Sequence, residues 1–203
     1  MAKSLKKKSL TKMKIFAIIA LTSLCITAFA QERHWSSPDH VILQYAGSIG
    51  YVSGGVGHNV FKGKARASLH FGHVPKAVGG PLNIFSTKLL FVPRRYQVSE
   101  RVVVNPFDAG LMISYHLGET FQSKWPEHQY PENYYWWRTS FRFHLNLESS
   151  VTMKMKDNTT FKAATGYLEL NSNELYLVSL FQNRRSLMLW DVLMVGAGVR
   201  LHF

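Results

Sequence analysis

The chain has 203 residues, a formal net charge of +12 and a single cysteine, Cys25. One cysteine excludes an internal disulfide framework, so the stability of the fold must come from packing and hydrogen bonding. Six of the 24 Lys and Arg residues lie within the first 14 positions; the remaining 18, set against 12 Asp and Glu, leave only +6. This modest charge gives little support for nucleic acid as a partner.

The first thirty residues have the composition of an export signal. Six lysines precede an apolar run, Ile15 to Ala30, which closes on Ala28-Phe29-Ala30. A basic start, a short apolar run and a small-x-small ending are typical of a cleaved secretory signal. The run is shorter than the roughly 20 apolar residues of a membrane-spanning helix. We therefore expect residues 1–30 to be removed, which leaves 31–203 as one domain.

Beyond the signal, the dominant pattern is that of β-strands. Aromatic and β-branched residues alternate with polar ones between glycine and asparagine breaks, and no stretch has a sustained helical stripe. Eight strands are expected, at 41–49, 50–61, 65–75, 83–93, 102–117, 136–148, 160–171 and 188–203. Ten strands is the alternative, because residues 149–181 alternate poorly and their start either extends the sixth strand or begins another.

The segment Trp136–Glu148 separates most cleanly into two faces. Successive strand side chains point to opposite sides, so odd and even positions meet different surroundings. The odd positions carry Trp137, Thr139, Phe141, Phe143, Leu145 and Leu147, whereas the even ones carry Arg138, Ser140, Arg142, His144, Asn146 and Glu148. Segments 108–118 and 66–72 repeat this separation, which predicts a sheet with one apolar and one polar face.

The connections between the expected strands alternate in length. Residues 61–64 form a tight turn, whereas residues 118–135 form a long, aromatic and proline-containing loop. A second long loop is expected near 172–187, with Arg184 and Arg185. Short periplasmic turns and longer external loops are typical of outer-membrane barrels. Both long loops are therefore predicted to lie on the outer side.

Two observations indicate that the apolar face meets lipid. The final strand has an apolar row at Val195, Ala197, Val199, Leu201 and Phe203, and this row resembles the terminal assembly signal of outer-membrane proteins, with Val199, Leu201 and Phe203 read by the barrel-insertion machinery. The polar phases are rich in glycine and serine, as the narrow lumen of an eight-stranded barrel requires.

The cost of burying charge in lipid then decides which face of each strand points outward. An arginine that faces lipid near the midplane costs about 2–4 kcal/mol, and an open sheet edge in lipid leaves unpaired backbone groups. The sequence therefore predicts an all-β fold, an antiparallel up-and-down transmembrane β-barrel. A polar network without an open pore is expected in its lumen, made of Arg66, His70, Arg138, Arg142, His144, Glu148, Arg200 and His202.

Two serines are weak candidates for a catalytic nucleophile. Ser114 and His116 share a strand face, but a spacing of two places their Cβ atoms roughly 6–7 Å apart, which is loose for a direct hydrogen bond. No metal site is expected, because His70 and His73, three residues apart on a strand, point to opposite faces. No cofactor is expected either.

The strand layout resembles that of the small eight-stranded bacterial outer-membrane barrels over most of residues 36–203. Among these it is loosely similar to the lipid A deacylases, in which a His-x-Ser-Asn motif supplies the base and the nucleophile. The corresponding stretch here is Leu168–Asn173, where Ser172-Asn173 matches the motif and Leu170 occupies the position of the histidine. The resemblance implies the topology, while Leu170 leaves Ser172 without that base.

These features predict an outer-membrane protein of a Gram-negative bacterium, of structural or binding type, and favour a barrel that is not an enzyme. Its expected partners are the barrel-insertion machinery and the surrounding membrane lipid, including lipopolysaccharide. A lipid A-modifying hydrolase is the alternative, and a soluble periplasmic barrel of the lipocalin kind is the third possibility.

Overall fold

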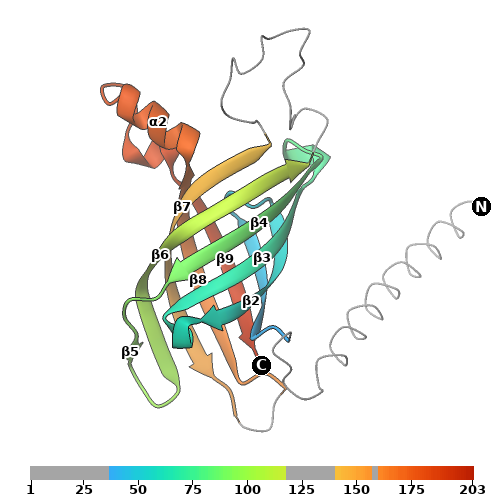
Figure 1. Cartoon of the computed structure of the whole chain (residues 1–203), viewed down its shortest axis with the longest axis vertical. Helices are drawn as coiled ribbons and strands as arrows, with labels where there is room; N and C mark the ends of the chain where they lie inside the picture. Colours follow the sequence, from blue (N-terminus) through green and yellow to red (C-terminus); the bar gives the residue numbers. More distant parts are fainter. Residues whose placement is uncertain (1–36, 118–139, 157–159) are drawn as a thin grey trace, which may run out of the picture. The chain divides into compact units, whose positions relative to one another are not determined.

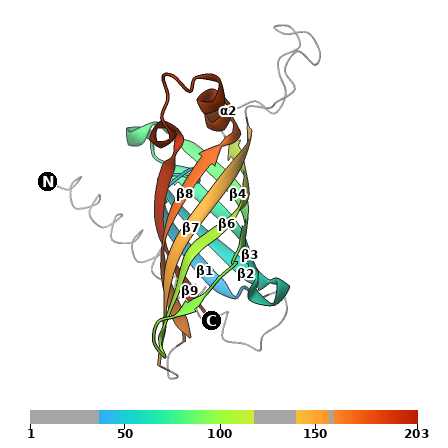
Figure 2. The same cartoon turned by 90° about the vertical axis from the view of Figure 1, so that its left-hand side faces the viewer.

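The computed structural model describes residues 37–117, 140–156 and 160–203, which form a closed antiparallel β-barrel (Figure 1). Its eight long strands are β1 (His40–Ala46), β2 (Val52–Val60), β3 (Ala65–Val74), β4 (Leu82–Phe91), β6 (Val102–Leu117), β7 (Phe141–Lys154), β8 (Ala163–Asn173) and β9 (Met194–His202). Pairing between β1 and β9 closes the barrel, as Figure 2 shows from the side. The all-β class and the count of eight strands are confirmed. The expected signal, the loop at 118–135 and Arg138 lie outside the described residues.

Strand bounds differ from those predicted mainly at the turns. The first two strands are separated by a turn in which Ala46, Gly47 and Gly50 have positive φ angles of 59°, 81° and 128°. Glycine adopts such angles without steric cost. β7 extends to Lys154, so the ambiguous stretch after Glu148 continues the sixth predicted strand rather than starting another.

The connections lie at two ends of the barrel. The end at which β1, β3, β6 and β8 finish is called the helix end, because α2 (Glu174–Gln182) lies there. The opposite end, near the C-terminus in Figure 1, is called the terminus end. It holds the 3₁₀ turn η1 (Phe61–Gly63) and the two-residue strand β5 (Tyr96–Gln97). The tight turn at 61–64 and the segment 172–187 thus lie at opposite ends, as predicted.

The helix α2 was not predicted, because the segment was expected to be a loop. Its sequence is apolar on nearly every side, so it has no amphipathic stripe to recognise. The side chain of Asn173 accepts a hydrogen bond of 2.9 Å from the Tyr176 backbone N–H and caps its N-terminus. Two further 3₁₀ turns are η2 (Lys76–Val78) and η3 (Leu189–Val192). No helix among the described residues is long and apolar enough to cross a membrane.

Side chains alternate between the lumen and the outer surface along every long strand. Exposed apolar side chains on the outer surface are Leu43, Val56, Leu69, Phe71, Phe85, Leu111, Ile113, Phe143, Leu145, Leu147, Leu168, Val195 and Val199. The strand registers place no Asp, Glu, Lys or Arg at an outward position of the eight long strands described. The barrel is therefore apolar outside and polar inside.

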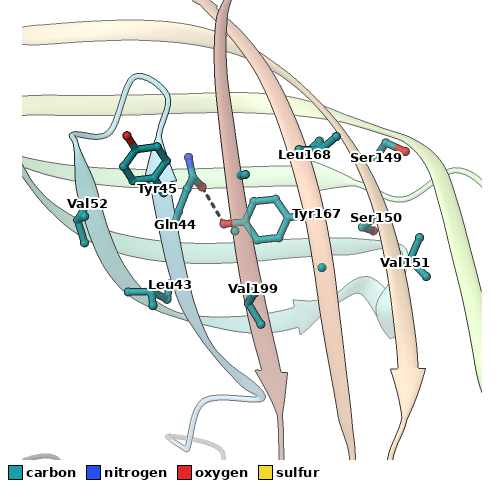
Figure 3. Close-up of a pocket in the computed structure, with 13 residues that line it drawn as sticks. Leu43, Gln44, Tyr45, Val52, Ser149, Ser150, Val151, Tyr167, Leu168 and Val199 are labelled. Atoms are coloured by element: carbon teal, nitrogen blue, oxygen red, sulfur yellow. Dashed lines mark hydrogen bonds between the residues drawn. The ribbon is translucent and has the colours of Figure 1, made fainter.

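Tyr167 lies in the lumen across the backbone of Gly198 (Figure 3), the residue it pairs with between β8 and β9. Its hydroxyl donates a hydrogen bond of 2.7 Å to the Oε1 atom of Gln44 on β1. A Cβ atom on Gly198 would overlap the tyrosine ring. The glycine therefore makes room for a ring that links three neighbouring strands.

Gly198→Ala is expected to lower the free energy of unfolding by about 1–3 kcal/mol, the usual cost of forcing an extra carbon into a packed site. Gly166→Ala is the matched control, because nothing lies within 4 Å of the added carbon. Urea unfolding of the folded barrel in detergent measures both. Equal stability of the two variants would contradict the packing of Tyr167 on Gly198.

Candidate functional site

The described lumen carries three cations and three carboxylates on different strands. The lysine and arginines are Arg66, Lys88 and Arg200, and the acidic residues are Asp108, Glu148 and Glu169; all six are buried. A buried ion has lost its hydration and must find a partner of opposite charge. Equal numbers of the two signs in the lumen satisfy that requirement.

Glu148 is the centre of the larger cluster. One of its oxygens, Oε1, accepts hydrogen bonds from Arg66 at 2.8 Å and from Arg200 at 2.5 Å. The other, Oε2, accepts from Arg200 at 2.9 Å, so the Arg200 guanidinium binds the carboxylate through two nitrogens. Arg66 also donates to Asp108 at 2.5 Å. This cluster joins β3, β6, β7 and β9 across the lumen.

Arg200 and a separate ion pair extend the polar interior. The Arg200 guanidinium lies 4.4 Å from the centre of the Tyr167 ring, within range of a cation–π contact. On the opposite strands Lys88 of β4 donates to Glu169 of β8. Asn171 donates to the second oxygen of that carboxylate at 3.1 Å. The interior is therefore held by side-chain bonds that cross between strands which are not neighbours.

The structure brings together some of the residues predicted for the lumen and separates others. Arg66, Glu148 and Arg200 form the central cluster. The histidines lie on the lumenal face but bind hydroxyls, namely His70 with Ser68, His144 with Ser114 and His202 with Thr165, each at 2.8 Å. Arg142 lies at the helix end, 3.5 Å from Glu174 of α2.

Sequence reasoning missed Lys88, Asp108 and Glu169 as network members. The signal that was available is charge balance, because the predicted lumen set has four arginines and only one carboxylate. A closed lumen needs counter-charges on the same strand phase, and Asp108 lies on the polar phase of its segment. A β-bulge between Asn105 and Asp108 interrupts the register and fixes where that carboxylate lies.

The structure buries both serine candidates. Ser114 forms its 2.8 Å hydrogen bond with Nε2 of His144 on the neighbouring strand, not with His116, and its side chain is fully buried. Ser172 is also buried, and its hydroxyl donates to the backbone carbonyl of Val192 at 2.8 Å. Both hydroxyls are enclosed by protein atoms, where a lipid substrate has no access to them.

The lumen is filled at the level of the central cluster. The cavity bounded by Arg66, Lys88, Glu148 and Arg200 has a volume of about 10 Å³. A site needs roughly 10–15 Å³ to hold a single water molecule. Side chains therefore fill the space between these four residues.

The filled lumen predicts that the protein gives no steady ion conductance. Purified folded protein added to a planar bilayer is expected to leave the baseline current unchanged, because hydrated ions are larger than the remaining space. A steady single-channel current would contradict the filled lumen. A large-diameter porin recorded under the same conditions serves as the positive control.

No group of three or more His, Cys, Asp or Glu side chains in the described part of the chain is arranged to hold a metal ion. Comparisons of the chain with protein-family models, with curated proteins and with solved structures give no match.

Proposed function

We propose that this chain is an integral outer-membrane β-barrel protein of structural or binding type, whose ends rather than its lumen meet ligands. The observation that carries the proposal is the outer surface of the barrel, which is apolar and without charged side chains on the described long strands. Soluble monomers rarely expose a contiguous apolar patch larger than a few hundred Å². A lipid environment accounts for that surface.

The polar interior argues against a soluble barrel of the lipocalin kind. Such a barrel buries apolar side chains around an internal ligand and turns its charged side chains toward water. Here Arg66, Glu148 and Arg200 are buried, whereas Leu43 and Leu168 are exposed by 63% and 61%. A soluble barrel would have the opposite distribution, with the charged residues outside and the apolar residues inside. The observed distribution supports a membrane surface.

The same geometry disfavours the hydrolase alternative. A lipid-modifying enzyme needs a nucleophile that an acyl ester in the surrounding leaflet can reach, together with a base within about 3 Å. Ser114 has a histidine partner but is enclosed in the lumen, and Ser172 donates to a backbone carbonyl. The export expected from residues 1–30 supports the outer membrane as the location of the barrel, with its lipid and lipopolysaccharide as neighbours.

Membrane fractionation tests the proposal directly. The expressed protein is expected in the outer-membrane fraction, to resist extraction with alkaline carbonate, and to migrate faster on a gel before heating than after it. A closed barrel resists unfolding by detergent at room temperature, which gives the faster band. Recovery of the folded protein in the soluble periplasmic fraction would overturn the proposal.

A further inference from the structure

The segment after α2 lies on the outward face of the barrel at the helix end. Ser172 pairs with Leu145 between β7 and β8, so both residues occupy outward positions. Leu145 is exposed, whereas Ser172 is covered, because the Val192 carbonyl accepts its hydroxyl at 2.8 Å and the Val192 side chain is itself buried. The turn η3 therefore packs against the outer wall of β8, and Figure 2 shows this deep-red segment beside the strand ends.

This segment carries large apolar side chains beside two cations. Trp190, Met188 and Phe181 are exposed by 74%, 73% and 62%. Arg184 lies 4.9 Å from the centre of the Phe181 ring, and Arg185 follows it in the chain. Within the described residues, no carboxylate lies at ion-pair distance from either arginine. We call the set Phe181, Arg184, Arg185, Met188, Leu189 and Trp190 the collar.

An apolar groove lies on the same outer wall, toward the terminus end. Its volume is about 610 Å³, and Figure 3 shows its side chains. Leu43, Val151, Leu168 and Val199 form its walls, while the small residues Gly166 and Ala197 leave the space between them. The groove crosses β7, β8, β9 and β1 and reaches Val52 at the start of β2.

The groove lies a short distance along the outer wall from the end of η3, which carries Leu189 and Trp190 of the collar. Leu168 pairs with Ala197 in the groove, and Asn171 pairs with Met194 where β9 begins, two residues after η3 ends. Three residues of strand span about 10 Å. An extended acyl chain is longer than this distance, so a lipid that lies beside η3 can place a chain in the groove.

We propose that the collar and the groove together bind one phosphorylated lipid of the surrounding leaflet. The two guanidinium groups would hold its phosphate, the exposed rings would lie at the membrane interface, and one acyl chain would fill the groove. Guanidinium groups bind phosphate oxygens through paired hydrogen bonds, and tryptophan is enriched at membrane interfaces. The inference rests on the proposed function, because it requires the outer wall to be in lipid.

An acidic protein or a second copy of this chain is a weaker candidate for the occupant. Either one could bind the two arginines, but neither requires an apolar groove that continues along the wall below them. A phosphorylated lipid matches the charge, the interfacial rings and the groove at once.

Lipid retention tests the arginines. The full chain is reconstituted in phosphatidylcholine vesicles that contain lipid A or its dephosphorylated form, then extracted and analysed by native mass spectrometry. We expect the wild-type barrel to retain lipid A and little of the dephosphorylated lipid. Arg184→Gln/Arg185→Gln should retain roughly a hundredfold less lipid A, because each of the two lost charge-assisted bonds weakens binding by about tenfold. The control Lys64→Gln/Arg94→Gln removes two exposed cations at the terminus end and should retain lipid A as the wild type does.

The groove has its own matched pair of variants. Ala197→Leu fills the groove, whereas Ala109→Leu makes the same change at another exposed outward position on β6. We expect reduced lipid A retention for Ala197→Leu only. The proposal is overturned if Ala197→Leu and Ala109→Leu retain the same amount of lipid A. It is also overturned if the arginine variant retains as much lipid A as the wild type.

Insertion is measured on the same samples, so the two proposals fail in different ways. A barrel that inserts and shows heat-modifiable mobility but has no preference for the phosphorylated lipid overturns the lipid site alone. A chain that stays in the aqueous fraction overturns the membrane assignment and the lipid site together. Loss of self-association in place of lipid retention, when the arginines are replaced, would identify the collar as a contact between copies.

Discussion

Glu148→Gln is expected to lower the free energy of unfolding by about 3–5 kcal/mol, the range measured when one partner of a buried ion pair is removed. The carboxylate accepts hydrogen bonds from Arg66 and Arg200, and both guanidinium groups are buried. The amide preserves the shape but has no charge to offset the two cations. Urea unfolding of the folded barrel in detergent or vesicles measures the loss.

Two comparisons separate the charge effect from a general effect of the substitution. Glu100→Gln changes an exposed carboxylate at the terminus end and should alter the stability by less than about 0.5 kcal/mol. Adding Arg200→Gln to Glu148→Gln removes one of the unbalanced cations, and Arg66 keeps its bond with Asp108. The double variant should therefore lose less stability than the sum of the two single variants. Additive losses would show that Glu148 and Arg200 do not act as a pair.

The strand pattern was predictable because a period of two is local. In the segment that becomes β7, each residue's face follows from its position alone, and His144 and Glu148 are buried while Phe143 and Leu147 are exposed. Because the charged residues share one face of the strand and the apolar residues the other, turning the strand over would bury the apolar residues and expose the charged ones. The closed topology was predicted from the cost of leaving unpaired backbone groups at an open sheet edge in lipid.

The side-chain partners that a residue has on other strands were not predictable from the sequence, unlike the face on which it lies. On its own strand Ser114 shares a face with His116, but the register between β6 and β7 brings it to His144 instead. The bond between Lys88 and Glu169 joins residues 81 positions apart. Such partners depend on strand register and on the bulge before Asp108, neither of which a single sequence defines.

Helix α2 and turn η3 were missed for a different reason. The residues of α2 are apolar without the spacing that marks one buried face, so no helix was predicted there. Those of η3 fall within 188–203, which was predicted to be a strand, whereas β9 begins only at Met194. Asn173 followed by Glu174 is an N-terminal helix signal that could have been used. The sequence does not show that the segment with the exposed Trp190 and Phe181 lies beside the apolar outer wall of the barrel.

Leu147→Arg is expected to destabilise the membrane-inserted barrel by about 2–4 kcal/mol, the cost of an arginine that faces lipid near the midplane. Leu147 occupies an outward position in the middle of β7, and its side chain is 48% exposed. Equilibrium unfolding in phospholipid vesicles measures the change. The yield of heat-modifiable protein after refolding into the same vesicles should also fall.

Met153→Arg provides the matched comparison, because Met153 faces outward on the same strand near the terminus end and is 59% exposed. An arginine near the interface costs only about 0–1 kcal/mol in lipid. A barrel surrounded by water would tolerate an arginine equally well at both positions, because both side chains are exposed. A large loss for Leu147→Arg beside a small one for Met153→Arg therefore requires a surface embedded in lipid, and equal small losses would exclude it.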